Sequence, residues 1–300
     1  MPFFFAKSLH RSKQISPAQE RDDANLAAVL HWALAKNGDD LSFPVAYLEF
    51  LRTCLETQTL TMKTIKQCKI KGDVGRRFNT LLEVITTPPP LSFFLADSLA
   101  RVAQRFQENT SPLRSGQWQS DVRAHFEISS SFGHLGRILA SIMRFMHTKN
   151  VLELGTAYGM SAMFILETMG SDGHLTTVEC GETQYNIASS LLRARYPSQV
   201  VCELGLTSDI LPRLCNELPP VDFLFHDAGH SHKDFVGDFY AALPLFASGA
   251  VVLIDDIFWN DPRFTARDPR CHEGWLKVAS HPRVVYAVEI NHEMGLLLLS

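Results

Sequence analysis

The chain has 300 residues, of which 46% are hydrophobic and 20% are charged, and its formal net charge is −4. This composition is typical of a globular protein with a sizeable core, and it excludes extensive disorder and fibrous repeats. The acidic balance also argues against a surface that binds nucleic acid over most of its area.

Helical patterns occupy the first third of the chain. Ser16-Pro17-Ala18-Gln19 combines an N-cap, a proline at the first helical position and a capping-box glutamine, and apolar residues follow at helical spacing as far as Leu34. Further helices are predicted from Pro44 to Leu55, near residues 78–85 and over residues 91–106. No strand is predicted before residue 120.

A linker is predicted over residues 109–116, where turn-forming residues accumulate. Residues 1–115 carry 15 Lys and Arg against 11 Asp and Glu, whereas residues 116–300 carry 13 against 21. These opposite balances of +4 and −8 suggest different roles for the two parts. We therefore expect an all-helical region over 1–115, which caps the substrate side or forms a dimer, and a second domain over 116–300.

A basic run lies inside the first part, with Asp73 as its only acid: Lys63, Lys66, Lys69, Lys71, Arg76 and Arg77. The favoured interpretation is a solvated helix face, because no interleaved aromatic residues provide a stacking platform. An RNA- or phosphate-binding surface is the alternative.

Strands and helices alternate in the second part. A helix over 135–146 leads into continuous apolar strands with helices between them, which predicts a parallel sheet covered on both faces. The strands are 151–154, 175–178, 200–204, 223–225 and 251–254, and the intervening helices are 161–169, 183–196, 208–214 and 233–246. Residues 284–290 and 294–299 predict an antiparallel hairpin at the end of the chain.

A glycine-containing turn follows the first of these strands, in the segment Glu153-Leu-Gly155-Thr-Ala-Tyr-Gly159-Met-Ser161. Its glycines allow a ligand to approach the backbone, and the next helix offers free N–H groups to an anion. Glu179 ends the next strand, where a carboxylate can accept both hydroxyls of a ribose. Because Ala157 and Met160 replace glycines of the dinucleotide fingerprint, and no Walker lysine is present, we expect adenosine without a pyrophosphate.

Carboxylates follow two neighbouring strands, with Asp227 after 223–225 and the pair Asp255-Asp256 after 251–254. Ligands of open α/β sheets bind at this edge. Three carboxylates brought together need a neutralising cation, and oxygen ligands suit Mg²⁺, Ca²⁺ or Mn²⁺. Acids that merely cap helices are the alternative. His230, in Asp227-Ala-Gly-His230, is a candidate general base, with helix capping or metal ligation as its other possible roles.

From residue 125 onward the sequence resembles the class I S-adenosylmethionine-dependent methyltransferases, and more narrowly the catechol O-methyltransferases and the metal-dependent macrolide-sugar O-methyltransferases. The resemblance implies a Rossmann-like sheet of seven strands, mostly parallel, with an antiparallel C-terminal hairpin. It also implies that residues 126–133 form a loop closing over the methionine end of the cofactor. The residues it assigns to cofactor binding are Glu153, Gly155, Thr156, Gly159, Ser161, Glu179, Leu206, Thr207, Ser208 and Asp227.

The same resemblance places a divalent cation, Mg²⁺ above all, on Asp227, Asp255 and Asp256, with Asp227 and His230 as the catalytic residues. Asp256 stands where the catechol group commonly has Asn, and His230 where it has Lys; the macrolide-sugar branch has the Asp-x-x-His pattern. The expected activity is methyl transfer to a hydroxyl of a small molecule, such as a phenol, a sugar or another natural product. RNA methylation and a non-catalytic methyltransferase fold are the alternatives.

The setting of the protein is expected to be cytoplasmic. Its six cysteines form no C-x-x-C pair, which favours free thiols in a reducing compartment. The apolar run after Met1 is too short for a signal peptide, and residues 241–254 are too few to span a membrane. We therefore expect a small-molecule acceptor, no nucleic-acid or membrane partner, and assembly as a homo-oligomer.

Overall fold

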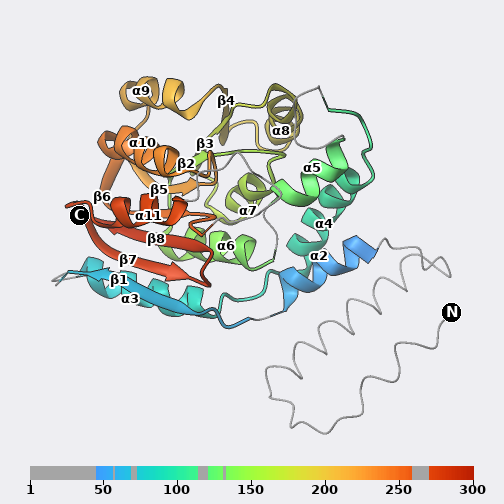
Figure 1. Ribbon diagram of the computed structural model, residues 1–300. Helices are drawn as coiled ribbons and strands as arrows, with labels where there is room; N and C mark the ends of the chain where they lie inside the picture. The colour runs from blue at the N-terminus through green and yellow to red at the C-terminus, as the bar shows by residue number, and fades with distance from the viewer. Residues whose placement is uncertain (1–44, 57, 69–72, 114–120, 131–132, 259–269) are drawn as a thin grey trace, which may run out of the picture.

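The computed structural model describes residues 45–56, 58–68, 73–113, 121–130, 133–258 and 270–300 (Figure 1). Their centre is one eight-stranded sheet with the order β1-β7-β8-β6-β5-β2-β3-β4. The five strands from β6 to β4 are parallel, whereas β8, β7 and β1 add to the sheet in antiparallel fashion. The strands are β1 (Met62–Gln67), β2 (Asn150–Leu154), β3 (His174–Glu179), β4 (Val200–Leu204), β5 (Val221–His226), β6 (Phe246–Ile254), β7 (Val284–Ile290) and β8 (Met294–Leu299).

Helices cover both faces of the sheet, so its central strands are apolar on both sides. One face packs on α9 (Thr207–Glu217), α10 (His232–Ala242) and α11 (Cys271–Ala279). The other face packs on α6 (His134–Met146), α7 (Met160–Thr168) and α8 (Glu182–Arg195), and on α3 (Asp73–Thr86), whose Phe78 ring meets Tyr286 of β7 at 5.1 Å. An outer layer over α6 and α7 consists of α2 (Val45–Leu55), α4 (Phe93–Gln107) and α5 (Val122–Ser129) (Figure 1).

The predicted α/β architecture is confirmed, and three details of the prediction are wrong. The sheet has eight strands rather than seven, because β1 lies within the region expected to be all helical. The helix expected over 233–246 ends at Ala242, where a short 3₁₀ turn (Leu243–Leu245) containing Pro244 leads into β6. Finally, the first half of the loop expected over 126–133 belongs to the helix α5, which ends at Ser129. The helix expected near residues 16–34 lies outside the described residues.

The N-terminal elements share a hydrophobic core with the sheet. Buried side chains of α2 and α4 form one cluster with those of α6 and α7, and the rings of Phe50 and Phe164 stack at 6.4 Å. β1 also pairs with β7 along its length. The division of the chain near residue 115 stays a prediction, but the elements on its two sides are packed together.

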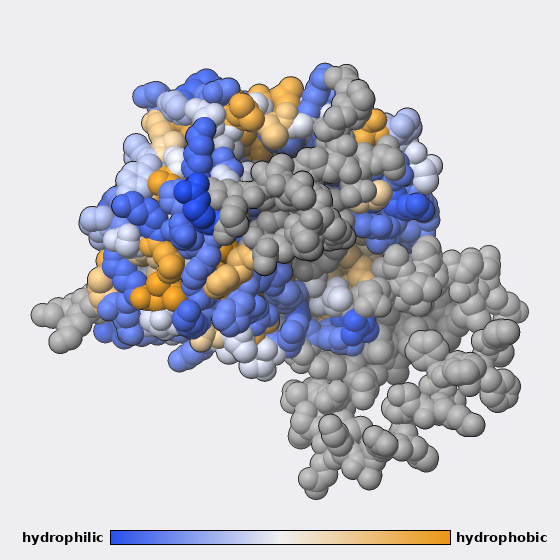
Figure 2. Space-filling view, viewed as in Figure 1, coloured by the Kyte–Doolittle hydropathy of each residue, from blue (hydrophilic) through white to orange (hydrophobic). Residues whose placement is uncertain are grey.

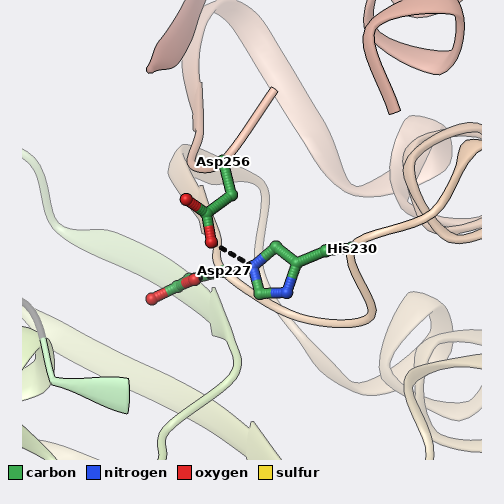
Figure 3. Close-up of side chains that lie close together, drawn as sticks. All are labelled: Asp227, His230 and Asp256. Carbon is green, nitrogen blue, oxygen red and sulfur yellow. Dashed lines mark hydrogen bonds and ion pairs between the residues drawn. The ribbon is translucent and has the colours of Figure 1, made fainter. Parts of the chain in front are cut away.

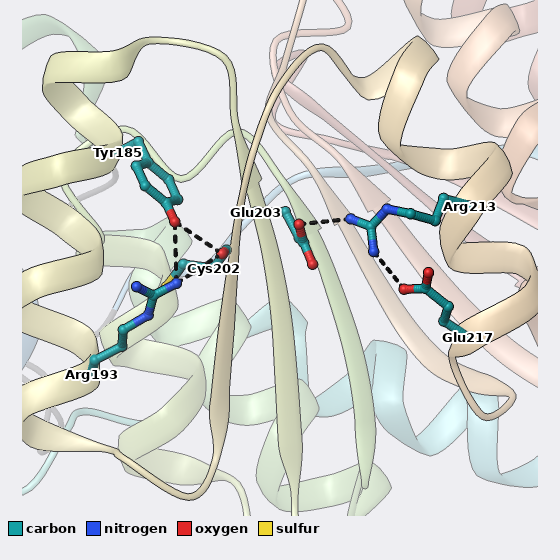
Figure 4. Close-up of polar contacts among 6 residues, drawn as sticks. All are labelled: Tyr185, Arg193, Cys202, Glu203, Arg213 and Glu217. Carbon is teal, nitrogen blue, oxygen red and sulfur yellow. Dashed lines mark hydrogen bonds and ion pairs between the residues drawn. The ribbon is translucent and has the colours of Figure 1, made fainter.

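The outer edge of the sheet, at β4, is covered by side chains from both neighbouring helices (Figure 4). Arg193 of α8 donates to the carbonyl of Cys202 at 3.1 Å, and the Tyr185 hydroxyl donates to the same oxygen at 3.4 Å. On the other side, Arg213 of α9 bridges Glu203 and Glu217. These contacts fasten α8 and α9 to the edge strand.

Hydrophilic side chains cover most of the described surface in the view of Figure 2, with small hydrophobic patches between them. Of the large apolar side chains that are exposed, three lie on or beside β4: Val201, Leu204 and Leu206. All six cysteines are free thiols, as predicted. Among the described helices, none combines the length and the apolar character that a membrane span requires.

Candidate active site

The turn between β2 and α7 is held open by residues with positive φ. Gly155 has φ +96°, and a Cβ atom on it would lie 2.1 Å from the carbonyl oxygen of Asp227, so only glycine fits. Gly159 also has a positive φ and directly precedes α7, which no described side chain caps. The first N–H groups of α7 therefore have no side-chain cap among the described residues, and their use by a ligand stays a prediction.

Glu179 closes this turn from the end of β3. Its Oε2 accepts from the N–H of Ala157 at 2.8 Å, and its Oε1 accepts from the N–H of Gly181 at 2.7 Å. Burial raises the pKa of this carboxyl, although the backbone hydrogen bonds act in the opposite direction. Each carboxylate oxygen has a second lone pair, so Glu179 can accept from a ribose while it keeps these contacts.

Glu153 lies beneath the same turn and is fully buried. Its Oε2 accepts from the Thr177 hydroxyl at 2.5 Å, and Thr177 in turn contacts the Thr156 hydroxyl. Burial raises the pKa of Glu153 to about 7, against the lowering effect of hydrogen bonds from Ser161 and Thr177. The structure thus brings together Glu153, Thr156 and Ser161 of the predicted motif, which support the turn through Thr177 and Glu153.

The segment that the resemblance assigns to the adenine edge begins α9. Leu206 is 57% exposed and Ser208 is exposed, whereas the Thr207 hydroxyl turns inward and donates to Asp238 Oδ1 at 2.7 Å. The other oxygen of Asp238 lies 3.1 Å from Nε2 of His226. Thr207 is therefore part of a buried polar chain to β5, and no sequence pattern indicated Asp238 as its partner.

Asp227, His230 and Asp256 converge beyond the ends of β5 and β6 (Figure 3). The Nε2 atom of His230 is 3.1 Å from Asp227 Oδ1 and 3.2 Å from Asp256 Oδ2. One ligand atom from each of the three residues lies within 4.8 Å of the others, which is a suitable spacing for a metal ion. Asp256 has φ +56°, an unusual value for a residue other than glycine, and this turn of the backbone accompanies its convergence on His230.

Asp255 differs from the other two predicted cation ligands. Its carboxyl does not belong to the converging set; it is buried and accepts from the N–H of Asp256 at 2.9 Å. Burial raises the pKa of Asp255 well above its ordinary value, and the charges of Asp227, Asp256 and Glu293 raise it further. The structure therefore places His230, rather than Asp255, between the two converging carboxylates.

Two residues near this cluster were not predicted. Glu293 lies in the turn between β7 and β8, and its Oε2 is 2.8 Å from Nε2 of His134 at the start of α6. The Glu293 carbonyl also accepts from the N–H of Ile257 at 2.9 Å. No sequence motif predicted Glu293 and His134 as partners, because the turn and α6 are far apart in the sequence.

Comparison with known proteins identifies the relatives of this domain. Residues 152–257 match a family described as a methyltransferase domain. A catechol O-methyltransferase from Niastella koreensis is 32% identical over 124 residues, which are 41% of this chain and 55% of that protein. A catechol O-methyltransferase from Mycobacterium tuberculosis is 28% identical over 123 residues, 41% and 54% of the two chains. The chain thus spans about half the length of these curated relatives.

Solved structures share the fold. An O-methyltransferase from Bacillus cereus in complex with SAH has a TM-score of 0.53 at 22% identity, covering 76% of this chain and all of that one. An O-methyltransferase from Streptomyces achromogenes, involved in tomaymycin synthesis and in complex with SAM, has a TM-score of 0.52 at 23% identity, covering 68% and 90%. Residues 152–257 thus match a methyltransferase domain, and the chain shares the fold of these solved structures.

Proposed function

We propose that this protein transfers the methyl group of S-adenosylmethionine to a hydroxyl oxygen of a small molecule. The observation that carries the proposal is that the turn after β2 and the carboxylate cluster lie against each other. The Glu179-closed turn and the cluster of Asp227, His230 and Asp256 adjoin at Gly155, which leaves no room for a side chain beside the Asp227 carbonyl. A methyl donor in the turn and an acceptor at the cluster would therefore be neighbours, as in-line transfer requires.

A divalent cation is the second part of the proposal, and the residues present fit one. Asp227 and Asp256 supply carboxylate oxygens. Burial and, after it, the neighbouring carboxylates raise the pKa of Asp255, and a nearby cation would relieve the repulsion among these carboxylates. When bound, such a cation polarises an acceptor hydroxyl and lowers its pKa. Asp255 would then support the site indirectly, by accepting the hydrogen bond from the backbone N–H of Asp256.

His230 is proposed to take the proton. The acceptor oxygen forms a bond to the methyl carbon, the carbon–sulfur bond breaks with its electron pair left on sulfur, and the hydroxyl proton passes to the imidazole. The position of Nε2 between two carboxylates also favours a second role, because the same atom can serve as a metal ligand. The variant His230→Gln distinguishes the two roles. If His230 is a metal ligand, the variant loses metal affinity; if His230 is the base, the variant keeps metal affinity and loses turnover.

The acceptor is proposed to be a small molecule rather than RNA. Three cationic residues of the basic run have partners within the chain: Lys63 pairs with Glu289, Lys66 donates to the carbonyl of His281, and Arg76 pairs with Asp73. The two ion pairs reduce the charge left for a phosphate backbone, and the third contact holds the Lys66 ammonium against the chain. The catechol O-methyltransferases among the relatives favour a phenolic acceptor.

Binding of S-adenosylhomocysteine tests the cofactor site. We expect this product to raise the melting temperature of the wild-type protein, because it binds the folded state. Glu179→Ala should abolish most of the rise, whereas Glu217→Ala, an exposed carboxylate of α9, should leave it intact. Absence of a shift in the wild-type protein would refute the cofactor, and an unchanged shift in Glu179→Ala would refute the role of that residue.

A further inference from the structure

A second buried carboxylate lies on β7, away from the cluster. Glu289 is 1% exposed, and three donors surround it. Its Oε1 lies 2.7 Å from Nε2 of His272 and accepts from Nε1 of Trp275 at 3.1 Å; its Oε2 lies 3.2 Å from the Lys63 ammonium. Although burial acts to raise the pKa of Glu289, these donors outweigh it and the pKa is lowered. Glu289 is therefore a charged anchor for the first turns of α11.

The His272 imidazole, held in this way, supports the chain that follows β6. It stacks on the ring of Phe258 with 4.0 Å between ring centroids and 21° between planes. Phe258 also meets the His292 ring edge-on, with 5.4 Å between ring centroids. The backbone N–H of the neighbouring Ile257 donates a hydrogen bond to the Glu293 carbonyl. Phe258 is two residues after Asp256, so the ring stack acts close to one carboxylate of the cluster.

The same end of α11 touches the chain that carries His230. The Cys271 thiol donates to the carbonyl of His230 at 3.0 Å. Gly274 lies so close to His232 that a Cβ atom would be 2.9 Å from its Cα. Helix α11 therefore contacts both segments whose side chains converge in Figure 3, one through Cys271 and the other through His272.

From these contacts we infer that Glu289 is a positioning residue for the site: by fixing His272, it sets the separation of the segments that bear His230 and Asp256. The inference rests on the proposed function, because it concerns the same cation and base. Among the described residues, Glu289 bonds to α11 and pairs with Lys63 of β1, and α11 is the element that reaches the chain on either side of the cluster. Groups that hydrogen-bond directly to a metal ligand are worth about 10–100-fold in metal affinity in characterised sites, and we expect the lower end of that range for Glu289, which acts through further contacts.

The test separates metal binding from cofactor binding. Glu289→Gln keeps the shape of the side chain but turns an amide N–H₂ toward groups that are themselves donors. We expect it to weaken Mn²⁺ binding, followed by electron paramagnetic resonance, by about tenfold or more. The affinity for S-adenosylhomocysteine, measured by calorimetry, should stay within about twofold of wild type, since that site adjoins β2 and β3. Glu203→Gln, a paired carboxylate at the other end of the sheet, is the matched control and should change neither affinity.

A second variant covers the case in which Glu289→Gln fails to fold. His272→Phe preserves a ring against Phe258 but removes the donor to Glu289, and it should weaken Mn²⁺ binding in the same selective way. Unchanged Mn²⁺ affinity in a folded variant, or equal losses for both ligands, would overturn the inference. A wild-type protein that binds neither Mn²⁺ nor S-adenosylhomocysteine would instead overturn the proposed function, and this inference with it.

Discussion

Replacing Gly155 with alanine tests the link between the cofactor turn and the carboxylate cluster. The new Cβ would lie 2.1 Å from the Asp227 carbonyl oxygen, about 1.3 Å inside the 3.4 Å at which ordinary contact begins. A left-handed conformation costs a residue with a side chain about 1–2 kcal/mol, and overpacking costs about 1–3 kcal/mol. We therefore expect Gly155→Ala to lower the free energy of unfolding by about 2–5 kcal/mol.

The damage should extend to binding, because the backbone on both sides of the contact must move. Asp227 would be displaced together with the turn, so affinities for Mn²⁺ and S-adenosylhomocysteine should both fall. Urea unfolding gives the stability change, and calorimetry gives the affinities. Gly237→Ala is the matched control, because a Cβ atom there meets nothing within 4 Å. The higher helix propensity of alanine should raise the free energy of unfolding of this control by about 0.5–1 kcal/mol. Wild-type stability and wild-type binding of both ligands in Gly155→Ala would refute the reasoning.

Three other outcomes are expected. The pKa of Glu153 rises from 4.5 to about 7 on folding, so the folded state is most stable at low pH, and the free energy of unfolding falls by about 3 kcal/mol as the pH rises through 7. Glu153→Gln should therefore remove most of the difference in stability between pH 5 and pH 8, measured by urea titration. Asp256→Asn should weaken Mn²⁺ binding more than Asp255→Asn does, measured by paramagnetic resonance, because only the former carboxylate converges with His230. A chain beginning at Ser120 should bind a hydrophobic dye that the full chain does not, since it lacks β1 and the helices that share the core; a compact, dye-free fragment would contradict this.

The central strands could be predicted because a strand buried on both faces is a continuous apolar run, as in Val251–Ile254. β1 could not be predicted for the opposite reason. It is an edge strand with one neighbour, its residues include Lys63 and Lys66, and its pairing with β7 is interrupted by an irregularity. Such a sequence has the composition of a solvated surface, and only the distant β7 makes it a strand.

The site shows the same division. Strand ends placed Asp227 and the Asp255–Asp256 pair at one edge of the sheet, but successive residues of an extended chain point in opposite directions. The sequence does not tell which of the two aspartates faces His230; that depends on the positive φ of Asp256. Glu289 could not be anticipated either, since Lys63 comes from the distant β1 and no pattern indicates that His272 and Trp275, 17 and 14 residues before it, turn toward it.

The side chains that cover β4 have a consequence for behaviour at high concentration. An edge strand with free carbonyl and N–H groups is a template on which another chain can add a strand, the first step toward aggregation. Arg193 and Tyr185 occupy the Cys202 carbonyl, and the Arg213 bridge places charge on the opposite face of the same strand. The apolar side chains of Val201 and Leu204 can thus remain at the surface without inviting strand-by-strand polymerisation from this edge.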